Sequence, residues 1–229
     1  MKKTIIFIPL IFCGILLLGQ GAEKKEVRPL KSFDKIKISK GINVTLIEGE
    51  MPEAEVVIVN AELEDVLIEQ KGKEVAIKMK TKLYKDVAVQ VYITYQKIRE
   101  IHAGLGGSLD ADDILETDQL VLTAGLDASI ELEIEVKKLV VSASAARVEV
   151  SGTADYIDVK TSTGGKFFGS ELECREASVK TNTGGSASVW VTKLLDATAG
   201  SGAKVEYKGN PTKVKYKETL GGRIVELIE

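Results

Sequence analysis

Along most of the chain, apolar and polar residues alternate one by one, and this pattern predicts β-strands. Strict alternation puts every second side chain on one face, so a strand can bury that face while the other meets water. The turn at Lys71-Gly72 separates two alternating runs and predicts a hairpin over 66–80. A helical period is almost absent, and only residues 60–65 are compatible with one helical turn. The clearest alternating runs are residues 44–46, 75–80, 87–93 and 131–136.

The second half of the chain repeats itself every 18 to 21 residues. The segment Val-Lys-Thr-Ser-Thr-Gly-Gly at 159–165 returns as Val-Lys-Thr-Asn-Thr-Gly-Gly at 179–185. A unit of this length cannot bury its own apolar face, so its copies must stack into a solenoid. The copies are rich in β-branched residues, Gly, Ser, Thr and Ala, which favours coils of parallel strand. Looser copies lie at 101–105, 122–126, 141–145, 197–201 and 217–224.

Together these patterns predict an all-β fold, a parallel β-helix or β-solenoid repeat domain with an N-terminal β capping region. We expect the β region at 22–97 and the solenoid repeats at 98–229 to form a single continuous domain. The cap is expected because an open end of the stack would expose unpaired strands. No proline occurs from 53 to 210, as expected where every backbone N–H joins a ladder.

Two features of the repeats carry more specific predictions. The Gly-Gly pairs are expected at corners, where a side chain would clash or φ must be positive. Thr161 is expected directly over Thr181, and the two hydroxyl groups are expected to form a hydrogen-bonded ladder along the stack.

The N-terminus has the parts of a secretory signal peptide, which we place at 1–21. Lys2 and Lys3 precede an apolar run at 5–18, small residues follow, and cleavage is expected after Gly21 or Ala22. The run is too short for a membrane span, which needs about 20 residues. An uncleaved anchor is the alternative. A lipoprotein signal at Cys13 is disfavoured, because the bulky Phe12 stands where a small residue is needed.

Export sets the expected compartment, stability and partners of the mature chain. The protein should be periplasmic, on the outer-membrane surface or extracellular, with no stable membrane span after signal removal. The formal charge of −3 becomes −5 without Lys2 and Lys3, which argues against nucleic acid as a partner. Cys174 is then the one remaining cysteine, so stability must come from packing rather than a disulfide.

Two short segments resemble a known family. Phe-Asp-Lys-Ile at 33–36 and Gly-Ile-Asn-Val-Thr-Leu at 41–46, followed by Gly49, are similar to the opening signature of the GIN-domain family of Bacteroidetes-type envelopes. The resemblance extends over 30–228 and implies an all-β solenoid, an exported location and adhesion as an autotransporter adhesin head. Gly41 by itself predicts a tight bend between two strands, with a ligand role for Gly41-Ile42-Asn43 as the alternative.

The chemistry-bearing residues form no recognisable catalytic or metal motif. The acidic stretch 110–113 resembles the adjacent acids of pectin-hydrolysing β-helices, but the companion His and Arg-Lys motifs are missing, so a solvated corner is expected. His102 is the only histidine, which disfavours zinc and a Ser-His-Asp triad. The Gly-Gly pairs lack the spaced aspartate of calcium-binding repeats. We therefore expect no enzyme activity, no catalytic residue, no cofactor and no metal ligand.

Three aromatic residues are the candidate ligand contact: Phe167, Phe168 and Trp190. A period of 20 residues places the two phenylalanines near 187–188, just before Trp190, so the three rings could share one aromatic patch, although the pattern favours a core position for at least one of them. The sequence thus favours a non-enzymatic, adhesin-like envelope module whose partner is a glycan or an envelope or host surface protein. A carbohydrate-active β-helix enzyme and a purely structural periplasmic protein are the alternatives, and the oligomeric state stays open.

Overall fold

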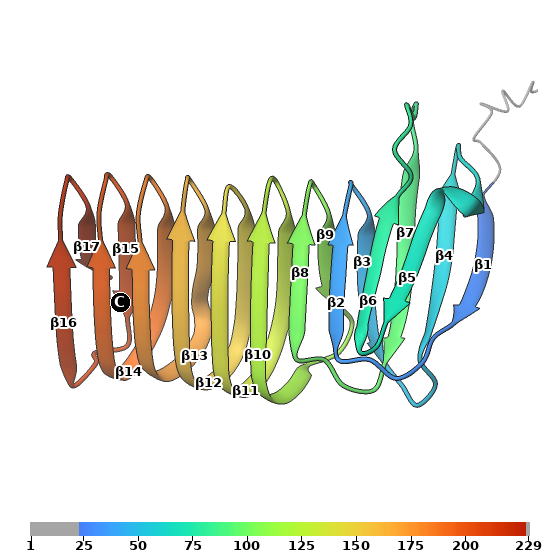
Figure 1. Cartoon of the computed structure of the whole chain (residues 1–229). Helices are drawn as coiled ribbons and strands as arrows, with labels where there is room; N and C mark the ends of the chain where they lie inside the picture. The colour runs from blue at the N-terminus through green and yellow to red at the C-terminus, as the bar shows by residue number, and fades with distance from the viewer. Residues whose placement is uncertain (1–22, 228–229) are drawn as a thin grey trace, which may run out of the picture.

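The computed structural model describes residues 23–227, and the predicted signal peptide lies outside this described part. The chain forms a β-solenoid of about seven turns that follows a curled half-barrel sheet (Figure 1). The predicted all-β solenoid fold is therefore confirmed. The one helical element in the described part is the 3₁₀ turn η1 (Leu63–Asp65), inside the segment where one helical turn is expected.

The coils have two straight faces, which meet at a tight turn on one edge and at a wider bend on the other (Figure 1). The long strands descend the rear face, pass through the bend and rise along the front face. Each of these strands therefore contributes its first half to the rear face and its second half to the front face. These strands are β11 (Ser129–Ser144), β12 (Arg147–Ser162), β13 (Lys166–Thr181) and β14 (Ser186–Ala199), while β10 (Leu115–Gly125) begins in the bend and forms only a front face.

Two strand rows, here called the front sheet and the rear sheet, run along the whole stack. The front sheet holds, in spatial order, β5 (Val66–Lys71), β6 (Glu74–Met79), β2 (Lys35–Ser39), β8 (Glu100–Gly104), β10, the second halves of β11 to β14, and β16 (Lys213–Glu218). The rear sheet holds β1 (Lys24–Pro29), β4 (Glu53–Val59), β7 (Ala88–Tyr95), β3 (Asn43–Glu48), β9 (Ser108–Ala111), the first halves of β11 to β14, β15 (Lys204–Lys208) and β17 (Arg223–Glu226). Pairing is parallel throughout the solenoid and antiparallel at β1, β4 and β5.

Parallel pairing places equivalent positions of successive coils side by side. Glu100 pairs with Val121, Lys138 with Tyr156 and Glu173 with Trp190, so a coil takes 17 to 21 residues, close to the 18 to 21 that the repeats predict. The division of the domain at residue 98 stays a prediction, although the coil made by β2 and β3 already stacks on β8 and β9.

Inward residues form continuous apolar rows between the two sheets. Fully burying a Leu, Ile or Val side chain stabilises the fold by about 1.5–3 kcal/mol, and each row repeats this gain at every coil. One front-sheet row is Leu122, Val141, Val159, Val179 and Ala197, and one rear-sheet row is Leu109, Ile130, Val148, Phe167, Ala187 and Val205.

The threonines inside the stack do not form the expected ladder. Thr161 and Thr181 are in register, as predicted. However, the Thr181 hydroxyl donates to the backbone carbonyl of Thr198 at 3.4 Å, and the Thr161 hydroxyl has no hydrogen-bond partner. The predicted side-chain ladder is therefore wrong, because the Thr181 hydroxyl turns toward the next coil's backbone instead of toward Thr161.

The tight turns explain the Gly-Gly pairs, and the two glycines act differently. At one corner, Thr163 and Gly164 both have left-handed φ values of 52° and 73°, and the N–H of Gly165 donates to the Ser162 carbonyl at 2.8 Å. This is a type I′ turn, which favours glycine. Gly165 has no such φ, but a Cβ there would strike the backbone carbonyl of Ala143 in the neighbouring coil. Gly41, with φ of 68°, forms the expected bend between β2 and β3.

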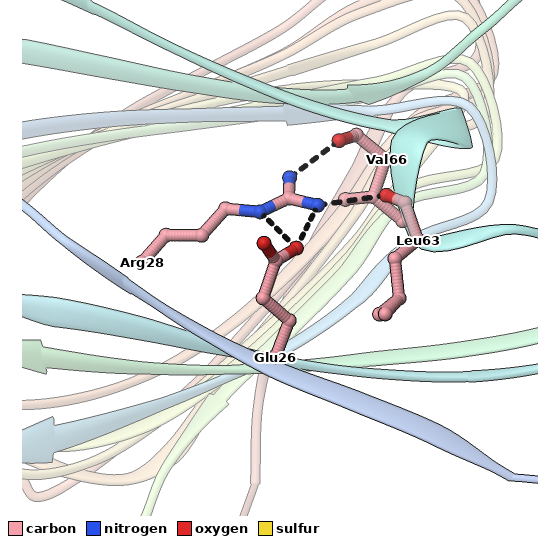
Figure 2. Close-up of polar contacts among 4 residues, drawn as sticks. All are labelled: Glu26, Arg28, Leu63 and Val66. Carbon is pink, nitrogen blue, oxygen red and sulfur yellow. Dashed lines mark hydrogen bonds and ion pairs between the residues drawn. The ribbon is translucent and has the colours of Figure 1, made fainter.

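The N-terminal end of the stack is closed by Arg28 (Figure 2). From β1 at the edge of the rear sheet, its guanidinium donates to the carbonyls of Val66 (2.6 Å) and Leu63 (2.8 Å), where the front sheet begins. The Glu26 carboxylate accepts two further bonds from the same group at 2.6 and 2.8 Å. Because backbone carbonyls cut off from water must be paired, this side chain replaces the ladder that the two edges cannot form.

We expect Arg28→Ala to lower the free energy of unfolding by about 1–3 kcal/mol, since it leaves the carbonyls of Leu63 and Val66 without their donor. Glu26→Gln is the matched control, because it keeps both carbonyl bonds, and it should cost less. Urea unfolding followed by circular dichroism measures both variants. Equal losses in the two variants would show that the guanidinium–carbonyl bonds do not close this end.

Candidate functional site

An open groove of about 770 Å³ follows the bend edge of β10 to β13. It crosses the strands and runs parallel to the solenoid axis. Because adjacent strands lie about 4.8 Å apart, the groove spans about 14 Å over these four coils. We call this feature the bend trough. It is an open groove along which an extended chain can lie.

The bend trough is built of three rows that the parallel register sets side by side. The floor is small or apolar, one wall is mainly acidic, and the other alternates in charge. The floor row is Thr117, Val136, Ala154 and Cys174; the acidic row is Glu116, Glu135, Thr153 and Glu173; the alternating row is Asp118, Lys137, Asp155 and Arg175.

The two walls differ in how their charges are paired. Lys137 lies 2.7 Å from Asp118, and Arg175 lies 3.7 Å from Asp155. The hydrogen bond from Lys137 holds the pKa of Asp118 below its ordinary value. In the acidic row, Glu135 and Glu173 form no ion pair with any residue in the described part of the chain. These exposed carboxylates can therefore accept hydrogen bonds from hydroxyl or amino groups of a ligand.

The strand pairing beside the bend trough is irregular. The register shifts between Glu149 and Gly152 and again between Gly169 and Glu173. Gly152 has φ of 103°, and a Cβ there would overlap the backbone of Ile134. Extra residues of this kind bend a strand and re-aim its side chains, often beside functional sites.

Cys174 is a structural part of the floor. It is 1% exposed, and its thiol lies 3.1 Å from the Trp190 carbonyl. Burial, aided by the charge of Glu173, raises the pKa of the thiol to about 12. The thiol therefore stays neutral and unreactive at ordinary pH.

We expect Cys174 in the folded protein to resist a maleimide or disulfide reagent at pH 8 and to react only after denaturation. The physical reason is that both the burial and the raised pKa suppress the thiolate, which is the reactive form. Mass spectrometry of the labelled protein, with and without denaturant, gives the result. Rapid labelling of the folded protein would show that the trough floor opens.

The structure separates the three predicted aromatic residues. Phe167 is 1% exposed and lies in the core between Val148 and Ala187, so it cannot contact a ligand. Phe167 therefore does not share an aromatic patch with Phe168, because strand alternation turns neighbouring residues to opposite faces. Phe168 points outward, with the guanidinium of Arg147 4.0 Å above its ring. A ligand contact at Phe168 and Trp190 stays a prediction.

Trp190 continues the acidic row of the bend trough by one coil. It pairs with Glu173 across β13 and β14, and its ring lies 4.6 Å from the ammonium group of Lys208. The row therefore continues to a partly exposed indole just beyond the residues that line the trough. Sequence reasoning named Trp190 but missed the rows before it. The period would have revealed them, since Glu116, Glu135 and Thr153 follow one another by 19 and 18 residues.

Other candidate chemistry lies outside the bend trough. Asp110 is exposed near the end of β9, and Asp112 and Asp113 are exposed in the bend that follows, as expected of a solvated corner. A smaller groove of about 310 Å³ is lined by Asp110, Glu131, Glu149 and Phe168, among others. His102 lies 2.6 Å from Glu100 on the front sheet. Across residues 23–227, no cluster of three or more His, Cys, Asp or Glu side chains is placed to hold a metal ion, and no helix there is long and apolar enough to cross a membrane.

The comparisons with known proteins concern nearly the whole chain. The family model described as "Putative auto-transporter adhesin, head GIN domain" matches residues 32–211. A crystal structure titled "putative adhesin" from Bacteroides fragilis is similar with a TM-score of 0.82 and 18% identity, over 90% of this chain and 97% of that chain. Another "putative adhesin", from Parabacteroides merdae, gives 0.73 and 23%, over 92% and 98%.

A third similar structure carries a different title. The "Putative lipid binding protein" from Parabacteroides distasonis gives a TM-score of 0.75 at 18% identity, over 92% of this chain and 98% of that chain. At such identities these likenesses establish the fold. No curated protein sequence matches the chain.

Proposed function

The chain belongs to the GIN-domain family of auto-transporter adhesin heads, and from this we propose that it is an exported, adhesin-like module that binds a glycan of the envelope or of a host surface without cleaving it. The compartment rests on the N-terminal signal pattern and on the adhesin-type names of the family and its relatives. A fold by itself does not fix function, so we assign the binding site from the geometry of the bend trough.

The observation that carries the proposal is the stacking of the three trough rows over four coils, with Trp190 at one end. A glycan chain offers hydroxyl groups along its length and apolar ring faces. The unpaired carboxylates of the acidic row can accept those hydroxyls, and charge-assisted bonds of this type are the stronger ones. The apolar floor and the indole can take the ring faces.

Binding without cleavage follows from the solvent exposure of the trough carboxylates. Glycoside hydrolysis needs one carboxylic acid kept protonated by its surroundings and a second carboxylate at a fixed distance. Glu116, Glu135 and Glu173 all lie exposed along one open wall, not in an enclosed apolar site of the kind that a general acid needs. We therefore assign them to ligand contact rather than to general acid catalysis.

The proposal is tested with a panel of neutral and amino-sugar glycans. Glu135→Lys should lower affinity for the bound glycan about tenfold, since it replaces an acceptor in the middle of the acidic row with a cation. Glu131→Lys is the matched control, because it makes the same change on the same strand but away from the bend trough. Equal affinity of the two variants, or no glycan bound, would refute the trough as the binding site.

Two further experiments test the absence of glycan cleavage and the cellular location of the protein. The chain length of the bound glycan should stay constant on long incubation, and its shortening would favour the hydrolase alternative. Protease shaving of intact cells should remove the repeats if they are on the surface. Cleavage only after the outer membrane is opened would place the protein in the periplasm and contradict the adhesin role.

A further inference from the structure

A group of lysines on the front sheet belongs to no site described above. Strand alternation turns these side chains outward, and the coil period brings them together from distant parts of the sequence. Figure 1 shows β11, β12 and β13 as neighbouring arrows in the front row, with β16 on the far side of β14. The group, here called the lysine face, is Lys138 on β11, Lys160 on β12, Lys180 on β13, and Lys213, Lys215 and Lys217 on β16, all exposed.

Lys160 and Lys180 are the centre of the lysine face. They pair directly across β12 and β13, about one strand spacing of 4.8 Å apart. Like charges placed opposite each other destabilise a sheet. Neither side chain forms an ion pair with any residue from 23 to 227.

Protection of a sheet edge cannot explain this central pair. Lysines are common on edge strands, where they block pairing with other chains, and β16 is such an edge. β12 and β13, however, are paired on both sides. Lys160 and Lys180 therefore need another reason to be adjacent.

Few carboxylates balance the lysine face. Asp158 and Asp196 lie among the lysines, while Glu176 is already held by Lys193 at 2.6 Å. The rear sheet of the same coils has the opposite sign, with Glu131, Glu133 and Glu135 exposed there. Although the chain is acidic overall, the front sheet thus presents a positive field to an approaching partner.

The groups between the lysines indicate the chemistry of that partner. Ser178 and Thr198 place hydroxyl groups beside Lys180, and Tyr156 adds a partly exposed ring. Among the large, strongly exposed apolar side chains that could insert into a bilayer, Met51 and Leu83 lie on loops away from this face. Tyr216 lies on β16, but it pairs with the inward-facing Ala197 and so points to the side opposite the lysines. The face therefore fits a hydroxyl-rich polyanion better than a lipid surface.

We propose that the lysine face binds a linear acidic polysaccharide whose sugar residues carry carboxylates. The polymer lies across the strands, parallel to the solenoid axis, so that successive carboxylates meet lysines of successive coils. This surface is on the front sheet and is separate from the bend trough. The protein is then two-sided, with one face for a polyanion and one edge for the glycan of the proposed function.

Binding of the purified protein to immobilised polygalacturonate tests the proposal, with neutral dextran, single-stranded DNA and phosphatidylglycerol vesicles as comparisons. Polygalacturonate should bind and should be released by salt, because exposed charges are screened. Lys160→Glu/Lys180→Glu should weaken binding on the order of tenfold or more, since two attractions become repulsions. The matched control Lys166→Glu/Lys204→Glu makes the same charge change on the rear sheet and should bind like the wild type.

Three results would overturn the proposal. They are no binding to polygalacturonate at low salt, equal losses in the two double variants, and equal or tighter binding of DNA or of the anionic vesicles. Circular dichroism shows that each variant is folded, so that a loss of binding is not a loss of structure. Glu135→Lys leaves the lysine face intact, so its effect on the trough glycan is independent of this result.

Discussion

Gly165→Ala is expected to lower the free energy of unfolding by about 3 kcal/mol, near the upper end of what one added methyl group costs in a packed site. A Cβ at this position would overlap the carbonyl and the following nitrogen of the Ala143–Ser144 peptide in the neighbouring coil. The obstacle is backbone that belongs to a parallel ladder. It can move only if the coil spacing changes, so the strain spreads through the stack.

The adjacent glycine provides the control. Gly164 has φ of 73°, and a Cβ there would meet nothing within 4 Å. Asn tolerates this left-handed conformation, so Gly164→Asn should change stability by less than about 1 kcal/mol. Thermal unfolding of the two variants compares them directly. Similar losses would show that the close approach to the Ala143 carbonyl does not restrict Gly165.

Phe167→Ala is expected to cost about 3–5 kcal/mol, the usual range for removing a buried phenyl ring. The ring is 1% exposed and contacts the small residue Gly169, where a Cβ would lie 2.5 Å from it. In the coil on one side its row neighbour is Ala187. Since small residues surround the ring, its removal leaves a cavity that they cannot fill.

Phe168→Ala is the matched control one residue later. Its ring is partly exposed and stacks under Arg147 at 4.0 Å, and a cation–π contact of this kind is worth about 0.5–1 kcal/mol. The expected loss is therefore near 1 kcal/mol. Denaturant unfolding of both variants measures the difference. A larger loss for Phe168→Ala would contradict the assignment of Phe167 to the core and Phe168 to the surface.

The local pattern was sufficient for the fold class. Alternation identified strands such as 75–80 and 131–136, and the copy of 159–165 at 179–185 revealed a stack of parallel coils. Gly-Gly pairs marked the corners for a simple reason. A type I′ turn and a close backbone approach both exclude a side chain, and that restriction is visible in sequence.

Side-chain roles were less accessible, because they depend on the direction of each residue within its coil. Phe167 and Phe168 are neighbours in sequence, yet one lies in the core and the other outside. The bulge between Glu149 and Gly152 shifts the register at the bend, and no repeat pattern predicted it. The sequence predicts a ladder between the Thr161 and Thr181 hydroxyl groups, but the Thr181 hydroxyl donates to the backbone carbonyl of Thr198 instead.

By itself, then, the sequence determined the strands, the coil length and the corners, because these follow from alternation, period and glycine content over a few residues. Only the tertiary structure decided what gathers on each surface. Glu116, Glu135 and Glu173 form one row, and Lys160 and Lys180 form a positive pair in an acidic chain, since stacking sets residues about 20 positions apart within one strand spacing. Arg28 likewise reaches Leu63 and Val66 only because the curled N-terminal sheet brings its two edges together.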